Sequence, residues 1–270
     1  MAILDKSSNY FKTVLYSGNG GTQNITSLDF QPDLVWLKKR NGGTYHNLAN
    51  SISGTGKVLY PNGNNAEASK TTIVTAFNSN GFSLGTEGDI NGSGGTFVSW
   101  SWKAGGSAAS NSNGSITTSI SANQDSGFSM VSYTGNNSNG ATIGHGLGAA
   151  PKMVIIKKKS DTAQWAVGGT NIDSTFNGYM FLDSSGSIAT SDNVFNDTAP
   201  SSSVVTLGTT GDSNSNGQTY IAFCFAEKQQ FSKMGSYVGN GNSSTPTFVY
   251  TGFKPSLVIT KPSSVSDGWT

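Results

Sequence analysis

The sequence contains one serine motif whose spacing could support nucleophilic chemistry. Residues 81–85 read Gly-Phe-Ser-Leu-Gly, which matches the G-x-S-x-G turn that exposes a nucleophilic serine between a strand and a helix. A glycine-rich, strand-like stretch follows Ser83, where this motif needs a helix. The two histidines of the chain, His46 and His145, stand in unrelated sequence surroundings, so we expect no serine-hydrolase site.

Cleavage of a polysaccharide ordinarily requires two carboxylates that face each other across the sugar. The chain has 15 Asp and Glu residues, and the acids that recur in its two related halves are Asp89 and Asp212, one in each half. One carboxylate in each half cannot run this chemistry alone, so we expect a protein that is not an enzyme. A catalytic site shared between the halves or between subunits is the alternative.

The same two acids begin loops that resemble the start of a calcium-binding loop. Asp89 and Asn91 occupy alternate positions before a glycine, as do Asp212 and Asn214, and oxygen ligands at this spacing suit a hard cation. An aromatic residue replaces the acid that completes such a loop at its twelfth position. We therefore expect no cofactor, and two interpretations of these loops stay open: calcium sites and Asx-type turns between strands.

Three aromatic residues in loop-like stretches are candidates for carbohydrate binding. Tyr45, Trp165 and Trp269 each follow an apolar run of strand length. Aromatic rings offer large apolar faces, which match the C–H face of a pyranose. The alternative for these residues is packing over the edge of a β-sheet.

The composition predicts a folded protein with an uncharged polar surface. Of the 270 residues, 11% are charged, compared with about 25% in ordinary globular domains, and 10% are aromatic, whereas disordered chains are poor in aromatics. The net charge of +1 provides no basic field for nucleic acid or an anionic membrane. Residues 1–6 do not have the pattern of a signal peptide, no apolar run is long enough to span a membrane, and the single cysteine, Cys224, fits a buried strand position.

A comparison of the sequence with itself reveals a duplicated stretch, which we call the second block. Residues 84–102 read LGTEGDINGSGGTFVSWSW and residues 207–225 read LGTTGDSNSNGQTYIAFCF, with eight of nineteen positions identical and no gap. Most of the other aromatic and aliphatic positions are similar in kind. A match of this length without a gap indicates an internal duplication.

Another stretch, which we call the first block, occurs three times. Residues 11–40, 128–159 and 231–261 each contain Phe, then Tyr-x-Gly-Asn, then a proline, then an apolar run that ends in lysine. With their second blocks, the first two copies form a first repeat (residues 9–104) and a second repeat (residues 127–230). The third copy has no second block before Thr270, so we expect either further chain beyond this residue or completion by a partner.

Apolar runs of strand length, separated by Gly- and Asn-rich turns, predict an all-β fold. Residues 97–102 alternate between two faces, and the continuous apolar runs at 34–37 and 153–156 fit central strands that are buried on both faces. A repeat of about 100 residues suits a sandwich of about seven to eight strands. We expect tandem β-sandwich modules of the jelly-roll or concanavalin type, two complete and one partial.

The expected domain boundaries follow from the repeats. Residues 1–126 form the first sandwich together with a Gly-, Ser- and Asn-rich stretch at 103–127, whose composition predicts a flexible linker with a possible edge strand at 115–121. Residues 127–230 form the second sandwich. Residues 231–270 begin the third.

The pattern of the repeats resembles a known family. The residues that carry the resemblance are 128–136 (FSMVSYTGN), 145–153, 219–227 and 231–241. They are similar to repeat-bearing virion proteins of marine tailed bacteriophages, which are tail-fibre-like or structural, and the similarity covers nearly the whole chain. It implies lectin-like sandwich modules on the particle surface and supplies no catalytic residues. The first repeat departs from the pattern, because residues 26–29 read TSLD where the second repeat has HGLG.

The low charge, the repeats and the resemblance together lead us to expect a phage virion structural protein. It would be a tail fibre or appendage that adheres to host-surface glycans. The alternatives are a head-attached fibre or decoration protein with a purely structural role and, third, a polysaccharide depolymerase. We expect contacts with other virion proteins and a homo-oligomer, with a trimer as the expected state, and neither nucleic-acid binding nor membrane insertion.

Overall fold

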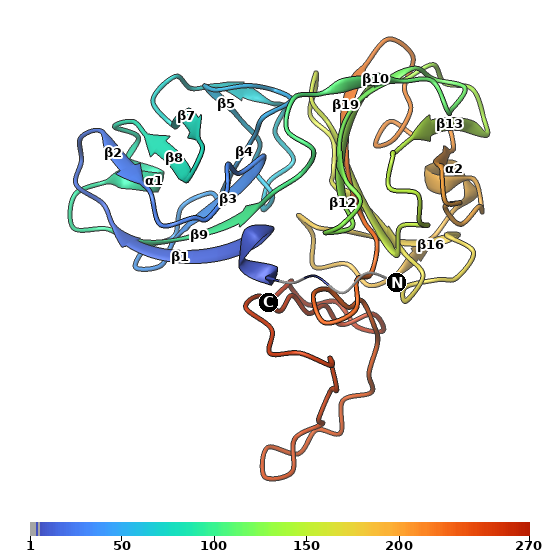
Figure 1. The fold of residues 1–270 in the computed structure, drawn as a ribbon. Coiled ribbons are helices and arrows are strands. Elements are labelled where there is room, and N and C mark those ends of the chain that lie inside the picture. Colours follow the sequence, from blue (N-terminus) through green and yellow to red (C-terminus); the bar gives the residue numbers. More distant parts are fainter. Residues whose placement is uncertain (1–3, 5) are drawn as a thin grey trace.

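The fold is built almost entirely from short antiparallel strands. The structure, a computed structural model, describes residue 4 and residues 6–270, so residues 1–3 and 5 of the stretch compared above with a signal peptide lie outside the described residues. Figure 1 shows two lobes side by side, formed by β1 to β9 and by β10 to β19, with the C-terminal segment, in red, below both. The prediction of an all-β protein is confirmed.

The first lobe contains two antiparallel sheets with a hydrophobic core between them. The larger sheet has the order β1 (Phe11–Ser17), β9 (Thr96–Trp102), β3 (Leu34–Lys39) and β4 (Asn47–Asn50). The smaller sheet has the order β2 (Gln23–Ile25), β8 (Gly81–Leu84) and β7 (Val74–Asn78), and β5 (Lys57–Val58) pairs with β6 (Ala68–Ser69). Val35 and Leu37 of β3 belong to one buried cluster with Phe82 and Leu84 of β8, so the core joins the two sheets.

The second lobe contains an eight-stranded sheet and a two-stranded sheet. The large sheet has the order β10 (Ala109–Asn111), β11 (Thr118–Asn123), β12 (Phe128–Thr134), β19 (Thr219–Phe225), β14 (Met153–Lys158), β15 (Ala166–Gly169), β16 (Gly178–Phe181) and β17 (Ala189–Thr190). The small sheet pairs β13 (Ala141–Gly144) with β18 (Val204–Leu207). Short helices complete the elements: Ser7–Asn9, a 3-10 helix, α1 (Gly88–Asn91) and α2 (Asp192–Phe195).

In both lobes, the strands of the first block pair with strands that lie at or next to the second block. β9 lies between β1 and β3, and β19 lies between β12 and β14. β8 pairs with β2, and β18 pairs with β13. The register also repeats, because Tyr16 lies opposite Phe97 and Tyr133 lies opposite Tyr220. β1 and β3, and likewise β12 and β14, are therefore joined in one sheet only through a strand of the second block.

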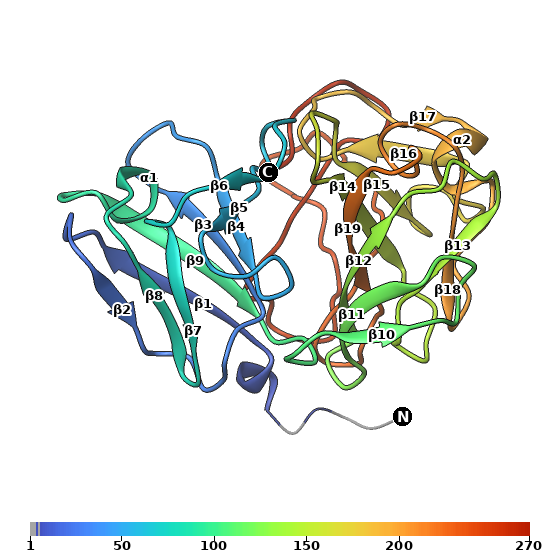
Figure 2. The ribbon, with the colours of Figure 1, turned by 90° about the horizontal axis from the view of Figure 1, so that it is seen from above.

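The two lobes pack against each other through a buried cluster. Leu34 and Leu48 of the first lobe belong to this cluster together with Phe128 and Trp165 of the second. Seen from above in Figure 2, the sheets that contain β9 and β19 face each other across this boundary. Lys157 contributes a polar link, because its Nζ donates to the carbonyl of Asn64 in the first lobe at 3.0 Å, and burial lowers the pKa of this lysine to about 8.

The connection between the lobes differs from the flexible linker that its composition predicts. The buried carboxylate of Asp33 accepts hydrogen bonds from the backbone N–H groups of Ala104 and Gly106, at 2.7 and 3.3 Å. Ser121 accepts a bond from Gly105 N–H, and its strand β11 pairs with β12. Gly and Ser favour flexibility only where their backbone groups have no such partners. In this connection, the Asp33 carboxylate and the pairing of β11 with β12 hold the backbone in place.

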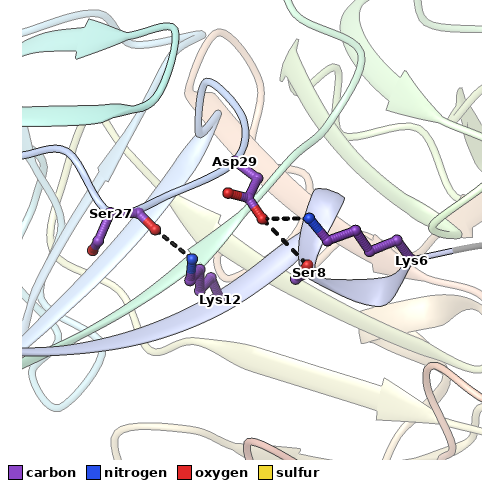
Figure 3. Close-up of polar contacts among 5 residues, drawn as sticks. All are labelled: Lys6, Ser8, Lys12, Ser27 and Asp29. Carbon is purple, nitrogen blue, oxygen red and sulfur yellow. Dashed lines mark hydrogen bonds and ion pairs between the residues drawn. The ribbon is translucent and has the colours of Figure 1, made fainter.

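The loop that departs from the family pattern anchors the N-terminal part of the first lobe (Figure 3). Asp29 forms an ion pair with Lys6 at 2.9 Å and accepts a hydrogen bond from Ser8. Lys12 donates to the carbonyl of Ser27. The hydrogen bond from Lys6 and the nearby charge of Lys12 lower the pKa of Asp29. In the second lobe the corresponding loop instead carries His145, which is buried.

Candidate functional site

An open depression on the first lobe brings one exposed aromatic ring together with several polar side chains. Its lining residues are Gly43, Thr44, Tyr45, Asn62 and Asp89. Tyr45 is 50% exposed, and its ring packs against that of Tyr60 with the centroids 5.3 Å apart. The hydroxyl of Thr44 is buried and has no hydrogen-bond partner among the described residues. The depression therefore offers an aromatic face, a carboxylate and an amide.

Charged groups lie close behind Tyr60. Lys70 is 3.4 Å from a carboxylate oxygen of Glu87, and its Nζ lies 6.0 Å from the centroid of the Tyr60 ring. Burial opposes the charge on Lys70, but Tyr60, Glu87 and Asp89 outweigh burial and raise its pKa. The lysine stays charged, and it balances the carboxylates near the depression. A neutral, hydroxyl-rich ligand suits such a balanced surface better than a strongly charged one.

Two loops hold the depression in shape. The backbone N–H of His46 donates to the side-chain oxygen of Asn62 at 2.8 Å, which ties the loop after β3 to the loop after β5. Nδ1 of His46 accepts a hydrogen bond from Nε1 of Trp36 at 3.2 Å. Burial, together with the charge of Lys38, lowers the pKa of His46 to about 4, so this ring is neutral at pH 7. A neutral imidazole is required here, because its Nδ1 must accept a hydrogen bond from the indole N–H.

The structure places the three predicted carbohydrate-binding aromatics in different environments. Tyr45 is exposed, but Trp165 is completely buried between the lobes, and its Nε1 donates to the carbonyls of Tyr60 and Gly63, both at 3.0 Å. Trp269 is half-buried, and its Nε1 donates to the carbonyl of Phe181 at 2.8 Å. The ring of Trp165 stacks on that of Phe223 in the second lobe and is completely buried, so it offers no open face to a sugar in this structure.

The two asparagines predicted as calcium ligands have a structural role in the structure. The side-chain oxygen of Asn91 accepts from the backbone N–H of Asn19, and its amide donates to the carbonyls of Gly21 and Gly85, at 2.7 and 3.0 Å. Asn91 is completely buried, and these bonds occupy its oxygen and its amide group.

The second lobe repeats this arrangement atom for atom. The oxygen of Asn214 accepts from Asn136 N–H at 2.9 Å, and its amide donates to the carbonyls of Ser138 and Gly208 at 3.0 and 2.9 Å. We call each arrangement the Asn junction: the buried asparagine of the second block, held by the Tyr-x-Gly-Asn turn of the first block. Asn91 and Asn214 would have to break these bonds to bind a cation.

A tyrosine completes each Asn junction. The hydroxyl of Tyr16 donates to the carbonyl of Ile90, and that of Tyr133 donates to the carbonyl of Ser213, both at 2.7 Å. Burial raises the pKa of both tyrosines above the ordinary value. The two repeated motifs, Tyr-x-Gly-Asn and Gly-Asp-x-Asn, are thus the two halves of one structural contact. Their joint recurrence was the sequence signal that could have revealed it.

The acids that begin the two loops have different surroundings. Asp89 lines the depression, whereas a side-chain oxygen of Asp212 accepts from the backbone N–H of Gln164 at 3.0 Å. Burial raises the pKa of Asp212, although the bond from Gln164 and the charge of Lys158 oppose this effect. Across residue 4 and residues 6–270, no cluster of three or more His, Cys, Asp or Glu side chains is placed to hold a metal ion.

The serine motif does not assemble a nucleophile with a base. Ser83 lies in β8, donates to the side-chain oxygen of Asn24 at 2.8 Å and accepts from the amide of Asn78 at 2.9 Å. Both partners are amides, which cannot remove a proton from the hydroxyl. His145 contacts Ser201 and Leu147 through its two ring nitrogens.

Two further predictions from the sequence concern single features of the chain. Cys224 is buried in β19, and burial raises the pKa of its thiol to about 12, which keeps the thiol protonated and unreactive. In the part of the chain that the structure describes, no helix has both the length and the apolar character to cross a bilayer.

The two lobes and the recurring Asn junction define a class: antiparallel all-β proteins built on an internally duplicated unit. Within this class, the chain belongs to the family described as a domain of unknown function (DUF7483), which matches residues 6–270. The family match spans both lobes and the C-terminal segment. Comparison with curated proteins and with solved structures finds no match.

Proposed function

We propose that the chain adheres to host-surface glycans through the depression around Tyr45, as a tail fibre or appendage of a phage virion. The observation that carries the adhesive part is the exposed Tyr45 ring beside Thr44, Asn62 and Asp89. A sugar ring could stack on the tyrosine while its hydroxyl groups bond to the carboxylate of Asp89 and the amide of Asn62. These are the few convergent polar groups that a ligand site requires.

The virion part of the proposal is supported by the sequence. The resemblance to repeat-bearing phage virion proteins, the 11% of charged residues and the internal repeats all favour a surface component of a particle. We propose that each lobe is a β-sandwich module of the jelly-roll or concanavalin type, and that residues 231–270 begin a third. Support comes from the core that joins the four-stranded and three-stranded sheets of the first lobe. Other virion proteins are the proposed partners, with a homotrimer as the proposed state.

A purely structural role, as a head-attached fibre or decoration protein, is the second candidate. The observation that favours it is the buried contact between the lobes, where Trp165 and Lys157 bond directly to backbone carbonyls of the first lobe. Such a contact resists hinge motion and suits a protein under mechanical load. A depolymerase is the third candidate, and it would need Asp89 to work with a second carboxylate across the depression.

The test of adhesion uses host polysaccharide and a glycan array. We expect the intact chain to bind, and Tyr45→Ala to weaken binding at least about tenfold, since loss of a stacking ring typically costs over 1 kcal/mol. Tyr250→Ala is the matched control, because Tyr250 is exposed and lies outside the depression. Equal binding by the wild type and Tyr45→Ala would contradict the site.

Two further measurements separate the candidates. A reconstruction of the virion that places the protein on the tail supports the fibre, and one that places it on the head supports the decoration role. Release of reducing sugar from host polysaccharide, abolished by Asp89→Asn, would establish the depolymerase and overturn the proposal of a non-catalytic protein.

A further inference from the structure

One loop of the first lobe belongs both to the Tyr45 depression and to the lobe boundary. This loop, residues 59–67, connects β5 to β6, and Figure 2 shows these two strands on the side of the first lobe that faces β14. On the depression side, Asn62 is a lining residue and the ring of Tyr60 packs against that of Tyr45. On the boundary side, the second lobe bonds to the backbone carbonyls of residues 60, 63 and 64.

Trp165 provides the first of these bonds from the second lobe. Its single Nε1–H is shared between the carbonyls of Tyr60 and Gly63, both at 3.0 Å. The backbone N–H of Gly63 in turn donates to the carbonyl of Tyr60 at 3.0 Å, which closes a tight turn over residues 60–63. Asn62 lies inside this turn, so the buried indole fixes the backbone that carries a lining residue of the depression.

Lys157 holds the next residue of the same loop. Its Nζ donates to the carbonyl of Asn64 at 3.0 Å and to that of Ala163 at 2.6 Å, so one ammonium group joins the two lobes. The carbonyl of Asn64 also accepts from the backbone N–H of Ala163 at 3.0 Å. Lys157 is completely buried, and an ammonium group is costly to bury without hydrogen bonds. The loop is therefore held where both carbonyls meet the charge.

Gly63 transmits the position of this turn to the exposed ring of the depression. A Cβ at Gly63 would lie 2.8 Å from Cε1 of Tyr45, so the backbone of Gly63 lies directly against the ring. The carbonyl of the same residue accepts the hydrogen bond from Trp165. A shift of the turn away from Trp165 would therefore remove the support on which the Tyr45 ring rests.

The same position of the two repeats holds this turn from opposite lobes. His46 lies fourteen residues after Pro32, and Trp165 lies fourteen residues after Pro151. The backbone N–H of His46 bonds to the side chain of Asn62, whereas the side chain of Trp165 bonds to the carbonyls on either side of that residue. The turn is therefore shaped from both lobes, and its geometry depends on how they dock.

We propose that Trp165 and Lys157 are positioning residues of the glycan site, through which the second lobe sets the geometry of the depression on the first. This role rests on the proposed glycan binding at the depression, and it makes the docking of the lobes a condition for that binding. The coupling is reciprocal: a change that loosens residues 60–64 weakens sugar binding, and a bound sugar tightens the lobe boundary at these residues.

The first test needs no sugar. It follows backbone amide exchange of the full chain at Gly63 and Ala163, whose N–H groups bond within the loop and to the loop. Trp165→Phe should raise exchange at Gly63, and Lys157→Met should raise exchange at Ala163, each by about tenfold, because local opening no longer breaks the lost hydrogen bonds. Unchanged exchange at these positions would overturn the proposal.

A matched control separates positioning from a general loss of stability. Phe128 belongs to the same buried cluster at the lobe boundary, but its ring contacts are with Trp102 and Phe225, away from the loop. Phe128→Leu should therefore destabilise the chain without changing exchange at Gly63 and Ala163. An equal rise in the control would show that these positions report only the stability of the boundary, which would overturn the proposal.

The second test measures binding of host polysaccharide by calorimetry, with dextran and mannan as neutral probes. Trp165→Phe and Lys157→Met should each weaken binding by about fivefold, whereas Phe128→Leu should stay within about twofold of the wild type. Full affinity in the first two variants, together with loss of binding in Tyr45→Ala, would overturn the positioning role and leave the glycan site standing. If the wild type binds none of these polysaccharides, the proposed function fails, and the exchange measurement alone decides whether the second lobe holds the loop.

The charge of Lys157 adds a readout that a loss of stability would not give. Burial lowers its pKa to about 8, the charges of Asp183, Asp212 and Asp161 oppose this effect, and that of Lys158 adds to it. As the pH rises through 8 the ammonium group becomes a neutral amine, which donates weaker hydrogen bonds. Wild-type affinity for the polysaccharide should therefore fall by about threefold between about pH 7 and pH 9, and Lys157→Met should show no such fall. The same pH profile in the variant would overturn the role of Lys157.

Discussion

The first and second lobes carry the same repeat, yet corresponding positions have opposite fates. Tyr45 and Asp89 line an open depression, whereas their counterparts in the second lobe, Gln164 and Asp212, are hydrogen-bonded to each other beside the lobe boundary. Trp165, the next residue, is completely buried there. Equivalent positions of the two repeats therefore form an open depression in one lobe and a hydrogen-bonded loop at the lobe boundary in the other.

What the two lobes share is equally informative. The Asn junction recurs with the same partners, and the stacked ring pairs Tyr16–Phe97 and Tyr133–Tyr220 lie 5.3 and 5.2 Å apart between centroids. The buried contacts between the two blocks are the same in both lobes, whereas the loops around them differ. The following variants either break this division between shared scaffold and divergent loops or make it sharper.

The largest expected effect belongs to the position that the lobe boundary closes. Trp165→Ala should lower the free energy of unfolding by about 4 kcal/mol, because loss of a fully buried indole leaves a cavity and removes the hydrogen bonds to the carbonyls of Tyr60 and Gly63. Trp165→Phe should cost about half as much, since the ring remains and the hydrogen bonds are lost. Denaturant titration measures both, and Tyr45→Ala should change stability by less than about 0.5 kcal/mol. Similar losses for Trp165→Ala and Tyr45→Ala would remove the contrast between closed and open sites.

The Asn junction should respond alike in the two lobes. Asn91→Ala and Asn214→Ala should each destabilise by about 3 kcal/mol, because each removes three hydrogen bonds to buried or partly buried backbone groups. Asn214→Asp should be no better tolerated, since a carboxylate cannot donate to the carbonyls of Ser138 and Gly208. Thermal unfolding of the three variants, with and without a chelator, measures the effect. A loss of stability in the variant of one lobe alone would show that the two Asn junctions have the same geometry but contribute differently to stability.

The connection between the lobes is held by hydrogen bonds to Asp33 of the first repeat, so it offers a third test of the comparison. Asp33→Ala should destabilise by about 2 kcal/mol and increase amide exchange at residues 104–106, because the backbone donors lose their acceptor. The control is Asp29→Ala, which removes an exposed ion pair and should leave the stability almost unchanged. If exchange in the connection were already fast in the wild type, the connection would be the flexible linker that its composition predicts.

The smallest expected effect is a dependence of the stability on pH. It comes from His46, whose backbone N–H bonds to Asn62 in the open depression. Burial holds the pKa of folded His46 at about 4, below the ordinary value of 6.5, so the unfolded chain binds this proton more readily. The contribution to stability is complete above pH 6.5 and falls as the pH drops through 4, by about 1 kcal/mol after allowance for the partial exposure of the ring. His46→Asn keeps an acceptor for Trp36 and should flatten this part of the curve. An unchanged slope in the variant would assign the acid sensitivity to His145, whose pKa burial also lowers.

The sequence predicts the strands better than their partners. The apolar runs at 34–37 and 153–156 form the central strands β3 and β14, as expected. A strand without a polar face is buried only where both faces of its sheet are covered. The sequence does not show what covers Trp165, since the covering carbonyls belong to Tyr60 and Gly63 in the other repeat. Aspartate and asparagine at alternate positions fit either a cation or backbone groups, and only the structure shows that Asn91 binds backbone.

The interleaving of the two blocks has a consequence for how the chain is made. Phe11 pairs with Trp102 and Phe128 pairs with Phe225, so the first strand of each repeat must wait for the last strand to leave the ribosome. Pairings this distant in sequence form slowly, and during the delay each repeat exposes strand edges that can join to the wrong neighbour. Two repeats of the same pattern heighten this hazard, because β9 and β19 occupy equivalent places beside β1 and β12. The different side chains along these otherwise matched strands then serve a second purpose, which is to let each repeat select its own closing strand.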